Sequence, residues 1–369
     1  MLASTPMRRT HTPLLLVAAC IISAATPITA TAAADPTARL TKITTVAKPT
    51  DIASRASDTG LYIAEQDGRV VRFDSKTRAK STALDLTGRT GASGERGLLG
   101  LVFHPNGRFL YVNYTDDDGD TVVARYRMRT NNTADPTSRV VLFTLPQPYA
   151  NHNGGGLAFG PGGRLYVGTG DGGSRDDPQR IALDRSSMLG KIISVHPLAR
   201  NAKSASARIW SVGLRNPWRF EFDDEMNLWV ADVGQDKWEE VNLARATAGS
   251  GRNANFGWSA YEGFARFNRD QTAKNHLRPV HVYEHGDQGC SISGGTKIRS
   301  PKLPALAGWY VYGDYCSGRI TAIKVVGSKA ARVVRLVDNA GSVTAVRTVA
   351  SGDVYVLAMG GDVSALLPG

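Results

Sequence analysis

The feature that most constrains the fold is a short hydrophobic phrase that recurs six times along the chain. Each copy reads Leu-Tyr-Val or a close variant, and most copies follow a polar turn that contains Gly or Asn. Most copies are also followed by a second short run of similar character, as expected for adjacent strands. The six copies occupy residues 61–63, 110–112, 165–167, 228–230, 310–312 and 354–356.

Six copies of one strand pattern predict an all-β fold, specifically a six-bladed β-propeller in which each blade repeats a small sheet. The 369 residues would allow two domains, but 39 glycines and few long helical patterns favour a single propeller domain over residues 35–369. We expect residues 38–46 to share a blade with the terminal hairpin at 354–366 and so close the ring. A β-sandwich with long loops is the alternative, although it gives no reason for six copies of one phrase.

Residues 1–34 have the organisation of a secretory signal peptide. Arg8 and Arg9 provide the basic start, residues 14–25 an apolar run, and the small residues up to position 34 the cleavage site. The apolar run is too short to span a bilayer, so we expect no transmembrane segment. The residues before Cys20 also resemble a lipoprotein cleavage box, which leaves a lipid anchor as a minor alternative. The mature protein is expected to be secreted or periplasmic.

Outside this leader the chain contains two cysteines, Cys290 and Cys316. In an exported protein, an isolated pair of this kind predicts a disulfide bond. A metal site would need more ligands than these two residues offer, and we reject that alternative.

The formal charge of +11 becomes +9 without Arg8 and Arg9, since these are the only charged residues of the leader. Such a balance is compatible with nucleic acid, an anionic surface or an acidic ligand. The Lys and Arg residues are scattered, however, without a basic run or a nucleic-acid-binding motif. We therefore expect a solvated basic surface and no nucleic-acid partner.

The segment NHNGGG at residues 151–156 is the strongest indication of chemistry. His152 stands between two asparagines and before three glycines, where backbone can approach a ligand closely. Histidine is well suited to accept a proton near neutral pH, and Asp171 follows nineteen residues later, after a predicted strand. A glycine-rich turn with an incidental surface histidine is the alternative.

Three other segments contain candidate functional side chains. At residues 213–220, Arg215 could bind a carboxylate and Asn216 offers an amide, the alternative being a structural arginine stacked on Trp218. The acidic run 232–241, which includes Glu240, offers oxygen ligands for calcium, the alternative being a solvated turn. Arg96, in the glycine-rich segment 94–105, is a candidate to reach the central channel.

Taken in order, several motifs resemble the glucose/sorbosone dehydrogenase family, which includes soluble quinoprotein glucose dehydrogenases and aldose sugar dehydrogenases. The resemblance extends from about residue 38 to the C-terminus. The motifs are EQDGR at 65–69, GLLGL at 97–101, HNGG at 152–155, GTGDGG at 168–173, GLRNPW at 213–218 and NFGW at 255–258.

This resemblance implies a six-bladed propeller that binds pyrroloquinoline quinone (PQQ) and calcium. It assigns His152 as the general base that takes the hydroxyl proton from C1 of a sugar, with Asp171 orienting the imidazole. It also implies that Gln66, Arg215 and Asn216 contact the quinone, and that the backbone carbonyls of Gly234 and Gln235 hold the calcium, with Glu240 as a further candidate ligand.

Quinone-binding members also bring a closely spaced arginine pair from the last blades to the cofactor carboxylates. The corresponding stretch here, residues 341–349, offers only Arg347, and Arg319 is the other candidate for this role. Residues 293–295 and 312–320 resemble a branch that includes hedgehog-interacting-protein-like propellers, some of which bind rather than oxidise.

We therefore expect an exported sugar dehydrogenase that passes electrons to an external acceptor. The alternative is a secreted, calcium-containing propeller that binds a glycan or a protein. A propeller hydrolase with a calcium-bound water is a third class, but no sufficiently specific set of ligands for it is present.

Overall fold

The computed structural model describes residues 1–3, 5–6 and 34–369, and the chain divides into two units, Met1–Asp35 and Pro36–Gly369. All the elements named below belong to Pro36–Gly369. The predicted leader, with Cys20, lies almost wholly outside the described residues and stays a prediction. No helix among the described residues is long and apolar enough to cross a membrane.

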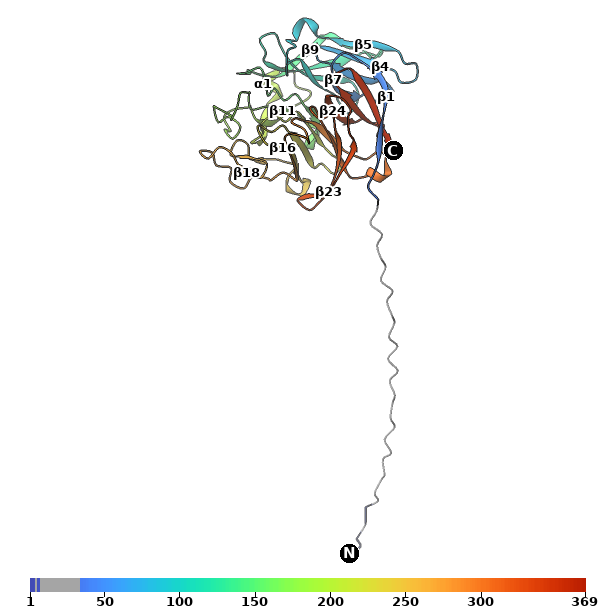
Figure 1. The fold of residues 1–369 in the computed structure, drawn as a ribbon, viewed down its shortest axis with the longest axis vertical. Coiled ribbons are helices and arrows are strands. Elements are labelled where there is room, and N and C mark those ends of the chain that lie inside the picture. Colours follow the sequence, from blue (N-terminus) through green and yellow to red (C-terminus); the bar gives the residue numbers. More distant parts are fainter. Residues whose placement is uncertain (4, 7–33) are drawn as a thin grey trace. The chain divides into compact units, whose positions relative to one another are not determined.

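Six four-stranded antiparallel sheets form the blades of a β-propeller, which confirms the predicted fold class (Figure 1). The first three blades are β2 (Pro49–Ser54), β3 (Leu61–Glu65), β4 (Arg69–Phe73) and β5 (Lys80–Asp85); β6 (Leu98–Phe103), β7 (Phe109–Thr115), β8 (Thr121–Met128) and β9 (Ala134–Leu145); and β10 (Leu157–Phe159), β11 (Leu165–Thr169), β12 (Lys191–Val195) and β13 (Arg208–Val212).

The other three blades complete the ring. They are β14 (Arg219–Phe222), β15 (Leu228–Asp232), β16 (Trp238–Ala244) and β19 (His281–Glu284); β20 (Ile292–Lys297), β21 (Tyr310–Asp314), β22 (Ile320–Val326) and β23 (Lys329–Val337); and β24 (Val343–Thr348), β25 (Val354–Ala358), β26 (Asp362–Pro368) and β1 (Ala38–Thr45). The elements outside the blades are short: α1 (Ala202–Ala205), the β17 (Tyr261–Glu262) and β18 (Ala265–Arg266) hairpin, and the 3-10 turns η1 (Thr87–Arg89), η2 (Pro161–Gly163), η3 (Ala246–Ala248) and η4 (Pro304–Leu306).

The ring closes as the sequence predicts. Strand β1, blue in Figure 1, pairs with β26 near the C-terminus, from Ala38 opposite Pro368 to Thr45 opposite Asp362. The first strands of successive blades contact one another in the order β2, β6, β10, β14, β20 and β24, and β24 returns to β2. These six strands therefore surround the central channel.

Each copy of the repeated phrase forms the second strand of a blade, in β3, β7, β11, β15, β21 and β25. These strands are almost entirely buried because both of their faces pack against neighbouring blades. Aromatic side chains make many of these contacts: Tyr62 meets Phe103 of the next blade with ring centroids 4.7 Å apart. Trp229 stacks on Tyr310 across another blade boundary at 4.6 Å. Burial on both faces explains why the phrase is aromatic and β-branched without alternation.

Charged side chains from three first strands meet inside the channel. Arg347 of β24 donates to both carboxylate oxygens of Asp51 in β2, at 2.8 and 3.0 Å. Arg219 of β14 lies 3.8 Å from the same carboxylate and donates to the carbonyls of Thr50 and Leu99. Burial alone would raise the pKa of Asp51, but Arg347 and Arg219 together hold it below its usual value. The network joins blades that are not adjacent in sequence.

Candidate active site

A cavity of about 790 Å³ lies on the propeller axis, since first strands β2, β20 and β24 and the loops that join successive blades line it. This volume is in the usual range for small-molecule sites. The cavity brings together six of the predicted site residues, Gln66, His152, Arg215, Asn216, Gly234 and Gln235. Of the remaining three, Asp171 lies directly behind His152, whereas Glu240 and Arg319 do not line the cavity.

His152 and Asp171 form a buried pair at the cavity wall. The Nδ1 atom of His152 lies 2.7 Å from Oδ1 of Asp171, and both side chains are almost fully buried. Gly173 N donates to the same oxygen at 3.0 Å, and Trp258 Nε1 donates to Oδ2 at 2.8 Å. An ionised Asp171 accepts the proton on Nδ1, so the lone pair of Nε2 is left for another partner. No described residue hydrogen-bonds to Nε2 of His152.

Glycines allow this pair to form by letting two backbone segments approach closely. A Cβ atom on Gly170 would overlap the carbonyl oxygen of His152, and one on Gly154 would lie 2.5 Å from the carbonyl oxygen of Gly168. Gly154 has φ +66°, and His152 itself adopts the left-handed region at φ +56°. The backbone N–H of His152 is held by Oε2 of Glu95 at 2.7 Å. The glycines of this segment therefore serve the geometry of the histidine.

Asp232 fixes the turn that presents Arg215 and Asn216. Its carboxylate accepts the backbone N–H groups of Arg215 at 2.9 Å and of Asn216 at 2.7 Å. Burial raises the pKa of Asp232 to about 7, although these two N–H groups act in the opposite direction. The Asn216 side chain then bridges two loops, accepting from Gly154 N at 3.0 Å and donating to Glu95 at 3.2 Å.

The Arg215 guanidinium faces the cavity from above the ring of Trp258, 5.6 Å from its centroid. Its Nη1 donates to the carbonyl of Val233 at 3.1 Å. The alternative in which Arg215 stacks on Trp218 does not hold, because Arg219 occupies that position at 4.7 Å.

Gln66 also presents one free polar atom to the cavity. Its Nε2 donates to the carbonyls of Gly94 and Arg96 at 2.8 and 2.9 Å, whereas its Oε1 has no hydrogen-bond partner among the described residues. In the segment after residue 93 it is Glu95, rather than the predicted Arg96, that lines the cavity. The Arg96 side chain turns toward the carbonyl of Tyr149 instead.

The loop of Gly234 and Gln235 lines the cavity with carbonyl groups that have no hydrogen-bond partner among the described residues. Oε1 of Glu262 accepts four successive N–H groups, from Gln235 to Trp238, at 2.8 to 3.3 Å. Gly234 N points toward Glu239 at 3.4 Å. Neither the carbonyl of Gly234 nor that of Gln235 accepts a hydrogen bond from a described residue. The amide groups of this loop are thus satisfied while two adjacent carbonyl oxygens stay available, which suits a hard cation.

Glu240 does not fit the ligand role predicted for it. The alternation of β16 turns its side chain away from the cavity. On that other face Oε1 accepts from Gly263 N, and Oε2 accepts from the side-chain amide of Asn242. Burial, and then the nearby Asp232, raises the pKa of Glu240 to about 8. Within the described part of the chain, no group of three or more His, Cys, Asp or Glu side chains is arranged to hold a metal ion. A cation in this cavity would depend mainly on carbonyl oxygens.

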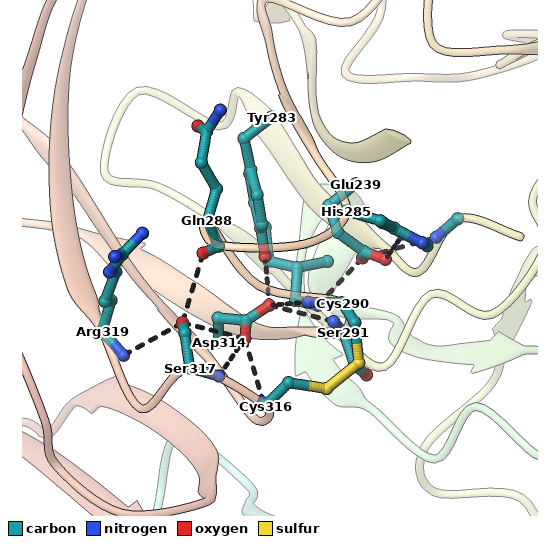
Figure 2. Close-up of a disulfide and its surroundings, with 12 residues drawn as sticks. Glu239, Tyr283, His285, Gln288, Cys290, Ser291, Asp314, Cys316, Ser317 and Arg319 are labelled. Carbon is teal, nitrogen blue, oxygen red and sulfur yellow. Dashed lines mark hydrogen bonds and ion pairs between the residues drawn. A yellow bond between two sulfur atoms is a disulfide. The ribbon is translucent and has the colours of Figure 1, made fainter. Parts of the chain in front are cut away.

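Neither of the late arginines reaches the cavity. Arg319 follows the turn between β21 and β22, and Figure 2 shows its side chain directed away from the disulfide beside the cavity. Arg347 is buried against Asp51 in the channel. Among the described residues, Arg215 is therefore the one Lys or Arg side chain that lines the cavity. The wall from the last blade consists of Val343, Thr344 and Met359.

The predicted disulfide between Cys290 and Cys316 is present, with Cα atoms 5.6 Å apart, and Cys290 lines the cavity. Figure 2 shows Asp314 beside it, accepting hydrogen bonds from both loops. Its carboxylate binds the N–H groups of Cys290, Ser291 and Cys316 at 2.9 to 3.1 Å and the hydroxyl of Tyr283 at 2.7 Å. The disulfide and Asp314 together fix this part of the cavity wall.

The fold and these motifs agree with comparisons to known proteins. The family model for glucose/sorbosone dehydrogenase matches residues 46–366. The HIPL1 protein of Arabidopsis thaliana is 31% identical over 335 residues, which cover 68% of this chain and 47% of that protein. The aldose sugar dehydrogenase YliI of Escherichia coli is 26% identical over 292 residues, covering 72% of this chain and 75% of that protein. The chain spans about half the length of HIPL1.

Among solved structures, the PQQ-bound aldose sugar dehydrogenase of Streptomyces coelicolor superposes with a TM-score of 0.72 at 22% identity, covering 91% of this chain and 99% of that one. This likeness shows a shared fold. The match of the family model to most of the chain goes further: the protein belongs to the glucose/sorbosone dehydrogenase family.

Proposed function

We propose that this protein is an exported dehydrogenase that oxidises an aldose or a related sugar with PQQ and calcium and passes the electrons to an external acceptor. The observation that supports this most directly is the buried pair of His152 and Asp171, whose free Nε2 belongs to a residue lining the axial cavity. A base held in one tautomer at the wall of a substrate-sized cavity suits the removal of a hydroxyl proton.

The cavity has hydrogen-bond donors and acceptors that suit both calcium and PQQ. The open carbonyls of Gly234 and Gln235 would hold calcium, and Gln66 Oε1, Asn216 and the Arg215 guanidinium would contact PQQ. When bound, PQQ supplies the two-electron acceptor for a hydride from the sugar carbon, and calcium supplies a Lewis acid beside it.

The residues of the chain then have distinct tasks in the reaction. His152 Nε2 takes the proton from the C1 hydroxyl of the sugar as the C1–H bond breaks, which leaves a lactone as product. Asp171 keeps the proton of the neutral ring on Nδ1 and stabilises the imidazolium that forms. Trp258 and Gly173 hold Asp171 in place. Glu95 fixes the backbone of His152, and Asp171 holds its ring at the cavity wall.

A second function, a secreted propeller that binds a glycan or a protein without oxidising it, is favoured by one specific observation. PQQ has three carboxylates, yet Arg215 is the one cationic side chain among the described residues of the cavity wall, and Glu95 adds a negative charge. The similarity to the HIPL1 protein is compatible with this alternative.

Reconstitution separates the two functions. The purified protein is titrated with PQQ and calcium, with binding followed by calorimetry, and dye reduction is then assayed across a panel of aldoses with His152→Ala as the control. The dehydrogenase is supported by PQQ binding at micromolar concentration and by sugar-dependent dye reduction that His152→Ala abolishes. Absence of PQQ binding at these concentrations would sink the dehydrogenase and leave the binding propeller.

A further inference from the structure

A second large hollow lies on the side of the propeller, away from the channel. It has a volume of about 750 Å³ and is formed by the end of β16, the loops at 248–255 and 274–280, and the turn at 327–329 between β22 and β23. We call it the lateral groove. None of its lining residues lines the axial cavity.

All of the charged side chains that line the lateral groove are basic. Six cationic side chains and His276 line it, and no Asp or Glu does. Five of the cations are exposed and make neither an ion pair nor a side-chain hydrogen bond with any described residue: Arg185, Arg252, Lys274, Arg278 and Lys329. Elsewhere on the surface, lysines such as Lys42, Lys237 and Lys302 each face a carboxylate. Five unpaired cations therefore gather around this one hollow.

Hydrogen bonds between segments build the groove into the fold. Arg245, the sixth cation, donates to the carbonyl of Gly327 at 2.8 Å and ties β16 to the turn of the next blade. Leu277 N donates to Asn255 O at 2.8 Å, and Ala330 N to Val280 O at 2.7 Å. The walls are therefore connected to each other and to two blades, so the hollow is formed before any ligand arrives.

The groove is remote from the proposed chemistry. Gln235, which lines the axial cavity, precedes the start of β16, while Leu243 and Ala244 at the far end of the same strand line the groove. A seven-residue strand spans roughly 20 Å at 3.3 Å per residue. A ligand in the groove thus does not occupy the axial cavity.

The remaining lining residues indicate what kind of anion fits. Leu243, Leu277, Pro279 and Val280 provide an apolar floor, and the half-exposed ring of Phe264 stands beside it. Sugar rings present apolar C–H faces to such surfaces. Asn253 and Asn275 also line the hollow, and their side-chain amides can both donate to and accept from hydroxyl groups.

From this combination we propose that the lateral groove binds an anionic polysaccharide. The exposed cations come from four separate segments, so they match charges repeated along an extended chain better than one compact anion. Guanidinium groups of Arg185, Arg252 and Arg278 suit the planar or tetrahedral oxygens of carboxylate or sulfate groups. The hollow shape and the amide lining favour a sugar chain over the flatter surface of an acidic protein.

The test measures binding of the full chain to polygalacturonate, which has carboxylates, and to dextran sulfate, with neutral dextran and single-stranded DNA in parallel. The groove variant combines Arg252→Gln, Lys274→Gln and Arg278→Gln. The matched control combines Lys42→Gln, Lys76→Gln and Lys80→Gln. It removes the same net charge from the first and last blades, away from the lateral groove. Dye reduction, where present, should be unchanged in both variants.

We expect the wild type and the control to bind at least one of the two anionic polysaccharides, and the groove variant to bind it about tenfold or more weakly with a shallower salt dependence. The anionic polymer that binds identifies the preferred acidic group. An equal loss in the control would mean that net charge alone is responsible, and equally tight binding of DNA would mean an unselective polyanion surface. Either result, or tight binding of neutral dextran, overturns the proposal.

Discussion

The indole Nε1 of Trp258 donates to Oδ2 of Asp171 at 2.8 Å, from a residue 87 positions farther along the chain. Both oxygens of Asp171 are therefore engaged, one by this indole and the other by His152 and Gly173. The carboxylate cannot rotate without losing a bond, and the orientation of the His152 ring depends on it.

Replacement of Asp171 by Asn should reduce sugar oxidation with little loss of folding. An amide has one oxygen for the three donors around it, and it no longer stabilises an imidazolium at His152. We expect kcat to fall about 100- to 10,000-fold, measured by dye reduction with the PQQ-loaded protein. Trp258→Phe should have a smaller effect, since Gly173 still holds Asp171. A kcat for Asp171→Asn equal to that of the wild type would contradict the role of this pair.

Calcium should raise the melting temperature of the protein, and Glu262 should be required for the effect. Oε1 of Glu262 orders the loop whose carbonyls are proposed as ligands. At a calcium concentration of 100 times Kd the stabilisation is about 2.7 kcal/mol, and Glu262→Ala should lose most of the shift in calorimetry. Glu240→Gln serves as the control and should retain it, because Glu240 does not line the cavity. A shift lost in Glu240→Gln and kept in Glu262→Ala would restore Glu240 as a ligand.

Removal of Arg347 should strongly destabilise the propeller. Arg347→Met leaves the buried Asp51 with Arg219 at 3.8 Å as its one remaining cationic partner, and removing one partner of a buried ion pair costs about 3–5 kcal/mol. Urea unfolding measures this loss. Asp51→Asn combined with Arg347→Met should cost less than the sum of the two single changes. The exposed pair of Lys42 and Asp362 gives a matched comparison, since Lys42→Met should change stability by about 1 kcal/mol or less.

His281 should make stability fall as the pH is lowered. Burial lowers the pKa of His281 to about 4, below the value of 6.5 expected in the unfolded chain. The unfolded state therefore binds a proton first, and stability decreases as the pH falls from 6.5 toward 4, by up to about 3 kcal/mol. His281→Gln can keep the contact with the Tyr312 hydroxyl, which lies 3.0 Å from Nε2. Its unfolding free energy should depend less steeply on pH in this range; an identical slope would argue against the assignment.

Asp314 should matter as much as the disulfide for the stability of the cavity wall. Asp314→Ala leaves the partly buried N–H groups of Cys290, Ser291 and Cys316 and the buried Tyr283 hydroxyl without their acceptor, at a cost of about 2–4 kcal/mol. Thermal unfolding of this variant, with the disulfide intact, measures the contribution of Asp314 alone. Asp314→Asn keeps one acceptor oxygen and should lose less. Equal melting temperatures for Asp314→Ala and the wild type would show that the disulfide suffices.

The repeated strand phrase was sufficient to predict the architecture, because the second strand of every blade faces the same surroundings. His152 and Asp171 could be predicted as a pair because glycines mark the segments that bring them together. The residues that support them could not. Glu95 and Glu262 accept N–H groups from segments 57 and 24 to 27 residues away, and such long-range bonds leave no local pattern.

Two arginines lie elsewhere than the family resemblance implies. Arg319 and Arg347 are expected at the cavity because quinone-binding members bring basic residues from the last blades to the cofactor carboxylates, yet neither lines it. A side chain in the channel lines the cavity only if it lies at the level of the cavity along the propeller axis. Arg347 lies instead at the level of the buried carboxylate of Asp51 and binds that group. Glu240 does not line the cavity either, because its carboxylate is bound by Gly263 N and the amide of Asn242.

The pairing of β1 with β26 also determines when the molecule can be completed. Lys42 and Asp362 contact each other across 320 residues of sequence, so the first strand to leave the ribosome waits for nearly the last. At about 5–20 residues per second this interval is roughly 16 s to one minute. Throughout it β1 lacks its partner strand and has unpaired backbone groups that other chains can bind. The last blade, and with it the closed ring, can therefore form only after β26 has been made.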